Sequence, residues 1–95
     1  MAYLLTVTGD GRPHAVAVVQ RWQDGRIMAD AGRHTRANVA ERPAVSLLWP
    51  SLDRTGPTLI VDGTGVVNGG DDPTVVITPT RAVLHLLRSS GTLEG

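Results

Sequence analysis

Residues 2–30 read AYLLTVTGDGRPHAVAVVQRWQDGRIMAD and hold two turn signals between three runs of strand-forming residues. Runs rich in Leu, Val, Ile and Thr favour β-strands, whereas Asp-Gly pairs tolerate the positive φ that tight hairpin turns require. The pattern predicts strands over residues 2–8, 14–22 and 26–30. Turns at Asp10-Gly11 and Asp24-Gly25 would join them into an antiparallel meander.

The rest of the chain predicts one short helix and three further strands. Residues 35–42 contain good helix formers and stop at Pro43, which cannot continue a helix, and Thr35 can cap the start. Apolar and β-branched runs predict the strands, with a bulge at Asp62-Gly63 and a break at Pro79. These strands cover residues 45–49, 58–67 and 74–87.

Six strands and one short helix in 95 residues predict a single all-β domain whose antiparallel strands close into a barrel. Parallel strands would need a crossover of a dozen or more residues at each step. We expect one domain over residues 1–95, with an ordered core at about 2–87 and a frayed tail at 89–95. A chain this short has a marginal core, which pairing with a second copy would extend.

Composition argues against several classes of function. The chain has nine acidic residues and nine basic residues, so its formal net charge is zero. All nine basic residues are Arg. Neutral charge and only three aromatic residues, Tyr3, Trp22 and Trp49, disfavour a nucleic-acid-binding barrel. The chain has no Cys and its three His share no ligand spacing, so no metal site is predicted. Without a signal peptide or an apolar run of about 18 residues, we expect a cytoplasmic protein with no membrane contact.

Three short segments are more specific than the strand pattern. They are GRPH at 11–14, AGRHTRANV at 31–39 and RPAVSLLWP at 42–50. In this order the chain resembles the pyridoxamine 5′-phosphate oxidase-like family of FMN-binding split-barrel proteins, over residues 2–87. The resemblance implies an antiparallel six-stranded split β-barrel that forms a homodimer. It also implies FMN, or alternatively a deazaflavin, in the groove between the two subunits.

The cofactor phosphate is expected at the start of the short helix. Arg33 and Arg36 are the predicted phosphate ligands, because guanidinium groups beside a helix N-terminus form charge-assisted hydrogen bonds with phosphate. His34 and Thr35 are further candidate donors to the same phosphate. The structural alternatives are two solvated Arg side chains and a Thr35 that only caps the helix.

The flavin ring is expected at the end of the third strand. There Asp30 and Ala31 are the candidate contacts, since a small side chain lets the backbone approach the ring and a carboxylate can accept from its imide N–H. Trp49 is a candidate wall of the pocket. The structural alternatives are a loop of small residues and a Trp49 that packs in the core or in the subunit interface.

No Gly-x-Ser-x-Gly, Walker or His-Glu-x-x-His motif is present, so the cofactor would supply any chemistry and the sequence identifies no catalytic residue. The predicted function is a flavin-dependent oxidoreductase that acts on a small-molecule redox substrate. The alternative is a non-catalytic dimeric split barrel with weak or no cofactor binding. It is favoured by His34-Thr35, which stands where members of the family often carry Arg-Lys.

Overall fold

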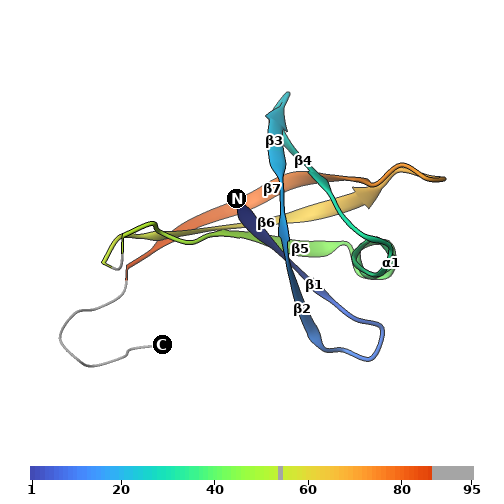
Figure 1. Cartoon of the computed structure of the whole chain (residues 1–95), viewed down its shortest axis with the longest axis horizontal. Helices are drawn as coiled ribbons and strands as arrows, with labels where there is room; N and C mark the ends of the chain where they lie inside the picture. Colours follow the sequence, from blue (N-terminus) through green and yellow to red (C-terminus); the bar gives the residue numbers. More distant parts are fainter. Residues whose placement is uncertain (54, 87–95) are drawn as a thin grey trace.

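The computed structural model describes residues 1–53 and 55–86, which form one antiparallel sheet and a single helix (Figure 1). The tail expected at 89–95 and the last residue of the strand expected at 74–87 lie outside the described residues. The elements in chain order are β1 (Ala2–Val7), β2 (Pro13–Val18), β3 (Gln20–Gln23), β4 (Arg26–Asp30), α1 (Arg33–Glu41), β5 (Ala44–Trp49), β6 (Thr58–Val67) and β7 (Thr74–His85).

The sheet is curled, and its two edge strands follow one another directly in the sequence. The strand order is β2-β1-β5-β6-β7-β4-β3, which places β2 and β3 at opposite edges. Only Val19 separates these two strands in the sequence, and Figure 1 shows them running on from one another. The first half of the stretch pairs with β1 and the second half with β4. This arrangement is a split half-barrel of seven strands.

The predictions of six strands and of a three-strand meander were therefore wrong at one place. Residues 14–22 were expected to form one strand, but the chain leaves one edge of the sheet at Val19 and joins the other. Both predicted hairpins are present, β1 with β2 and β3 with β4. They lie at opposite edges, because the inner neighbours of β1 and β4 are β5 and β7.

Local chemistry explains the turns and the irregularities. Asp24 and Gly25 have φ of 53° and 76°, the two successive positive values of a two-residue hairpin turn. The register of β6 and β7 shifts between Asp62 and Gly63, which confirms the predicted bulge. Pro79 pairs with Gly63 at this shift and does not break β7. A proline, which lacks an N–H donor, is tolerated where the ladder is already interrupted.

The helix begins two residues earlier than predicted. Gly32 is its N-cap residue and no side chain caps it, so the prediction of Thr35 as the cap was wrong. Its C-terminal end is as expected, because Arg42 precedes a proline and adopts an extended conformation. The Arg42 N–H closes the last turn on the Asn38 carbonyl at 2.8 Å. No helix within the described ranges has the length and apolar character needed to cross a membrane.

The core fills the concave side of the sheet, under α1. Strand residues alternate between this side and the outside, as the buried and exposed positions of β1 show. The helix contributes Val39, which is 1% exposed. The other large side chains that are fully buried come from four strands: Leu4, Ile27, Leu47, Val75 and Ile77.

We expect Gly63→Ala to destabilise the protein by about 1–3 kcal/mol, because the new methyl group has no room. A Cβ at Gly63 would lie 2.7 Å from the Thr78 carbonyl oxygen and 2.8 Å from Cγ2 of Ile77. Urea denaturation of the variant measures the loss. Gly69→Ala is the matched control, since a Cβ there meets nothing within 4 Å. Equal stability of the two variants would contradict the tight pairing at the bulge.

Candidate functional site

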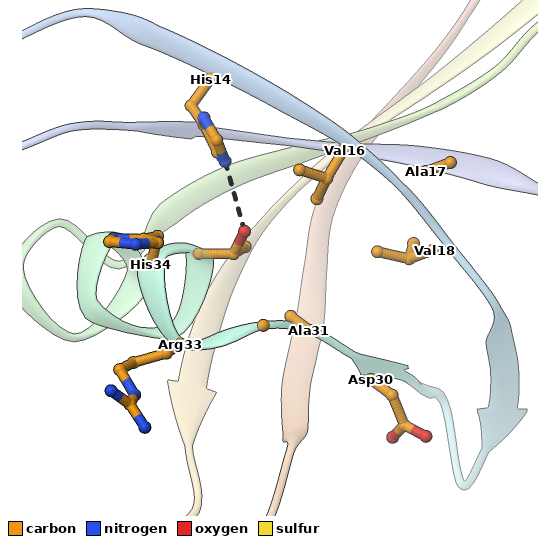
Figure 2. A pocket seen from close by; sticks show the side chains of 10 residues that line it. His14, Val16, Ala17, Val18, Asp30, Ala31, Arg33 and His34 are labelled. Carbon is orange, nitrogen blue, oxygen red and sulfur yellow. Dashed lines mark hydrogen bonds between the residues drawn. The ribbon is translucent and has the colours of Figure 1, made fainter.

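A pocket of about 300 Å³ opens where β2 separates from β4 (Figure 2). Among the described strands β2 pairs only with β1, and its other side faces the connection between β4 and α1 across the pocket. The pocket is therefore a consequence of the split in the barrel. Its lining comes from β2 and from the β4–α1 connection: His14, Val16, Ala17, Val18, Asp30, Ala31, Gly32, Arg33, His34 and Thr35.

The two walls of the pocket have different chemistry. Val16 and Val18 of β2 give an apolar wall. The opposite wall is the start of α1, where the first N–H bonded within the helix is that of Arg36, to the Gly32 carbonyl at 3.0 Å. The N–H groups of residues 33–35 precede it and have no partner inside the helix. With the helix dipole, they make this end of the pocket favourable for an anion.

Five of the seven residues predicted for the site line this one pocket. Asp30 and Ala31 end β4 and enter the connection, and Arg33, His34 and Thr35 form the first turn of α1. Ala31 and Thr35 are buried, whereas Asp30, Arg33 and His34 are exposed. In Figure 2 the Arg33 guanidinium and the Asp30 carboxylate point away from β2. The charged groups therefore stand at the rim and the small side chains line the interior.

The other two predicted residues, Arg36 and Trp49, do not line the pocket. Nη1 of Arg36 donates a hydrogen bond to the Ala31 carbonyl at 2.7 Å, so this side chain braces the connection that forms one wall. Trp49 stacks against Trp22, with ring centroids 6.3 Å apart and planes inclined by 19°. Within the described chain, Trp49 thus packs against a second aromatic ring.

Asp30 belongs to a polar cluster beside the pocket. Its carboxylate lies 3.8 Å from the Arg21 guanidinium and accepts a hydrogen bond from the Thr74 hydroxyl at 3.4 Å. The Thr74 backbone N–H donates to the Asp72 carboxylate at 2.9 Å, and this bond holds the pKa of that exposed carboxyl below its usual value. These contacts turn the Asp30 charge toward β7 and Arg21.

Sequence reasoning missed His14 as a pocket residue, having considered it only as a metal ligand. Its Nε2 lies 3.4 Å from Oγ1 of Thr35, and this contact bridges β2 and α1 across the pocket. The signal was available, because His14 shares a strand face with Val16 and Val18, and Val18 is buried. A half-buried imidazole two and four residues from core valines must face inward.

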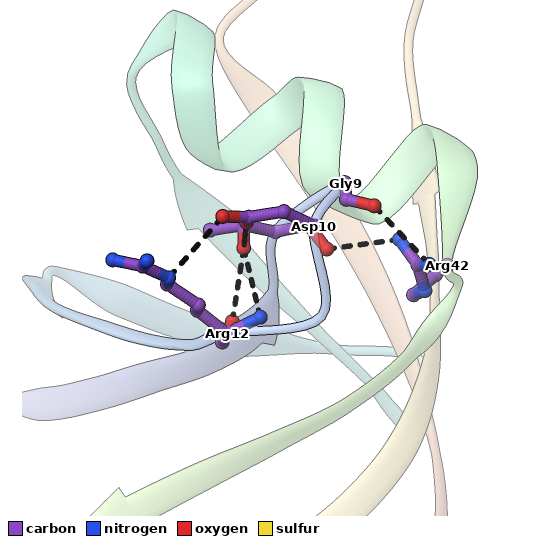
Figure 3. Close-up of polar contacts among 5 residues, drawn as sticks. Gly9, Asp10, Arg12 and Arg42 are labelled. Atoms are coloured by element: carbon purple, nitrogen blue, oxygen red, sulfur yellow. Dashed lines mark hydrogen bonds and ion pairs between the residues drawn. The ribbon is translucent and has the colours of Figure 1, made fainter.

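Polar contacts with the β1–β2 hairpin add to the packing of Val39 in holding the helix over the sheet. Nδ2 of Asn38 donates to Oγ1 of Thr6 at 3.1 Å, and both residues are buried. At the helix C-terminus, Nη1 of Arg42 donates to the Thr8 carbonyl at 2.9 Å and Nη2 to the Gly9 carbonyl at 3.4 Å (Figure 3). These bonds fix the orientation of α1, and hence the position of its first turn at the pocket.

We expect Thr6→Val to destabilise the fold by about 1–3 kcal/mol, because it leaves the buried Asn38 amide without an acceptor. A double-mutant cycle with Asn38→Ala, followed by urea denaturation, isolates the pairwise contribution. The exposed Thr64→Val is the control and should change stability by less than about 0.5 kcal/mol. Additive effects of the two substitutions would show that this bond does not hold the helix.

Solved structures with the same fold were found by structural comparison. An F420 reductase superposes with a TM-score of 0.71 over 86% of this chain and 87% of that chain, at 19% identity. The Group A Streptococcus protein HupZ superposes with a TM-score of 0.73 over 99% of this chain and 89% of its own, also at 19% identity. These matches show the split-barrel fold.

Sequence comparison finds relatives in mycobacteria. The uncharacterized proteins Mb0449c of Mycobacterium bovis and MT0457 of Mycobacterium tuberculosis are each 42% identical to this chain over 98 aligned positions. The alignment covers 88% of this chain and 69% of each relative. No protein-family model matches the chain. At this identity and coverage, the chain belongs to the same protein family as Mb0449c and MT0457.

Proposed function

We propose that the protein binds a flavin-type nucleotide, FMN or alternatively a deazaflavin such as F420, in the pocket between β2 and α1. The observation that carries the proposal is the convergence of Asp30, Ala31, Arg33, His34 and Thr35 on one pocket. The fold shared with an F420 reductase supports the same class of cofactor. The proposed activity is that of an oxidoreductase of the pyridoxamine 5′-phosphate oxidase-like type with a small-molecule redox substrate.

The residues present fit such a nucleotide. The N–H groups at the start of α1, which precede the first bond within the helix, and the exposed Arg33 suit a phosphate, since backbone donors and a guanidinium both bind its oxygens. Val16, Val18 and Ala31 suit the apolar faces of a flavin ring. His14 and Thr35 contact each other at the helix end of the pocket, and each can donate a hydrogen bond to the ligand.

The side chains of the pocket bind and orient, and the bound cofactor would supply hydride transfer. Arg36 holds the Ala31 carbonyl and so keeps the wall of the pocket in place. Val16 and Val18 exclude water from the face that they cover. We assign none of these residues to proton transfer.

We propose that the protein acts as a homodimer. One chain provides about 300 Å³, at the lower end of the roughly 300–1,000 Å³ that ligand pockets occupy, so one copy encloses only part of a nucleotide. Large apolar side chains are also exposed, among them Trp22, Leu84 and Leu86. In Figure 1 the far ends of β5, β6 and β7 extend beyond the rest of the sheet. A second copy would cover such surface and complete the groove.

Titrating FMN, and separately F420, into the purified protein tests the proposal through the absorbance and fluorescence of each cofactor. We expect saturable binding of one of them at micromolar concentrations. Absence of binding for both at tens of micromolar would remove the cofactor function. It would favour the second candidate function, a non-catalytic split barrel. The hydrogen bond between Arg36 and the protein's own backbone favours this candidate, because Arg36 is then not free to bind a phosphate. Binding without turnover of any reductant would favour a carrier over an enzyme.

A further inference from the structure

A histidine and a threonine from two different elements meet at the helix end of the pocket. His14 is half-buried on β2, and Thr35 is 3% exposed in the first turn of α1. Nε2 of the imidazole lies 3.4 Å from Oγ1 of the hydroxyl (Figure 2). The free backbone N–H groups of α1 belong to the same turn, so an oxyanion bound by them would lie next to this pair.

The charged side chains around His14 are paired or bonded elsewhere, or stand at the rim. Its register partner on β1 is the uncharged Thr6. The titratable residues nearby belong to the β1–β2 turn, the β4–α1 connection and the start of α1: Asp10, Arg12, Asp30, Arg33, His34 and Arg36. The acid and the arginine of the turn pair with each other, and Arg36 holds a backbone carbonyl. Asp30 and Arg33 point away from β2, and His34 is exposed. Among the lining residues, His14 is thus the half-buried group that can bring a proton-dependent charge.

We propose that protonation of His14 controls the binding of a doubly charged oxyanion, such as phosphate or sulfate, at this end of the pocket. The proposal rests on the nucleotide site of the proposed function and adds a residue that regulates its phosphate-binding end. A neutral imidazole has one donor and one acceptor nitrogen, and Nε2 accepts from the Thr35 hydroxyl. In this state the hydroxyl proton is used within the protein.

Protonation reverses the hydrogen bond between the two side chains. Both nitrogens of an imidazolium are donors, so Nε2–H of His14 donates to Oγ1 of Thr35, and the hydroxyl proton is free to turn toward the anion. The imidazolium also places a positive charge beside the helix N-terminus, where the helix dipole already favours an anion. Because histidine gains its charge between about pH 8 and pH 5, the affinity for the anion rises as the pH falls.

NMR titration with inorganic sulfate tests the proposal, because sulfate keeps both of its charges over the range in which histidine titrates. At constant ionic strength, sulfate should shift the amide signals of residues 33–35 and bind about tenfold more tightly at about pH 5.5 than at about pH 8. His14→Gln should lose this dependence, since an amide does not titrate. His85→Gln, at an exposed position of β7, is the matched control and should keep it.

The imidazole signals of the wild-type protein give a second measurement that needs no variant. Coupling between two ligands is reciprocal, so a tenfold gain in sulfate affinity requires saturating sulfate to raise the midpoint of the His14 titration by about one pH unit. The His85 signal should not follow. Thr35→Val should reduce the gain in affinity on acidification, because the hydroxyl donor is then missing.

Each result decides the proposal. The same pH dependence in His14→Gln as in the wild type, full dependence in Thr35→Val, or absence of sulfate shifts at the start of α1 would overturn it. Cofactor binding is measured separately. Sulfate bound in a His14-dependent way by a protein that binds neither FMN nor F420 would remove the cofactor function and leave the proton-dependent anion site. A bound cofactor with no response of the His14 signal to sulfate would do the reverse.

Discussion

Replacing Arg33 and Arg36 together by Ala is expected to weaken FMN binding by about 100-fold or more. A hydrogen bond to a charged group contributes about 1.5–3 kcal/mol, and each 1.4 kcal/mol is a factor of ten in affinity. The Arg33 guanidinium stands exposed at the rim beside the helix N-terminus, and its removal takes away a charge that can close on the phosphate. Removal of Arg36 releases the Ala31 carbonyl and loosens one wall of the pocket.

The single variants separate these two roles. Arg33→Ala should lower affinity by about tenfold and leave stability unchanged, because its side chain is exposed. Arg36→Ala should lower both affinity and stability, since it breaks a part-buried bond of 2.7 Å. Fluorescence titration gives the affinities and urea denaturation the stabilities. Arg26→Ala, at an exposed arginine of the β3–β4 hairpin, is the control.

Unchanged affinity in the double variant would show that neither guanidinium at the start of α1 binds the phosphate. The remaining donors there are the backbone N–H groups of residues 33–35, which substitution of side chains does not remove. Replacing His14 by Phe would then show whether the ligand lies deeper, against β2. A loss of affinity in that variant alone would place the polar part of the ligand next to the contact between His14 and Thr35.

Local signals in the sequence predicted most of the fold. The positive φ values at Asp24 and Gly25, the bulge at Asp62-Gly63 and the end of the helix before Pro43 all follow from the chemistry of single residues. The split at Val19 does not. Side chains of residues 13–23 point alternately to the two faces of the sheet, and no turn signal interrupts them. Only the closure of the sheet decides that the first part of this segment pairs with β1 and the second part with β4.

The sequence also predicted only part of the candidate site. The stretch from Asp30 to Thr35 is continuous in the chain, so recognising one member was enough to find the others. His14 is about 20 residues away in the sequence and enters the pocket from the other edge of the sheet. Alternation along β2 indicates that His14 faces inward, but no local pattern shows that this face meets the start of α1. Arg36 has the right chemistry for phosphate, but its position on the helix brings it to the Ala31 carbonyl.

Leu47→Ala is expected to destabilise the protein by about 3–4 kcal/mol, the largest change in stability that we predict for a single substitution. Leu47 is fully buried in β5, where it pairs in register with Leu4 of β1 and with Val61 of β6. The ladder fixes both neighbours, so the sheet cannot collapse around the missing side chain and a cavity remains. Thermal denaturation should show a fall of roughly 12–30 °C, at 4–8 °C per kcal/mol for a domain of this size.

Leu52→Ala is the matched control, because Leu52 is fully exposed in the β5–β6 connection and should tolerate the same change within about 0.5 kcal/mol. A small effect at Leu47 would mean that β5 is in another register, since a slip of one residue sends its side chain to the outer face. That slip would also bring Ser46 to the core and remove its bond to Asp62. The stability of Leu47→Ala therefore tests the register of β5 between β1 and β6.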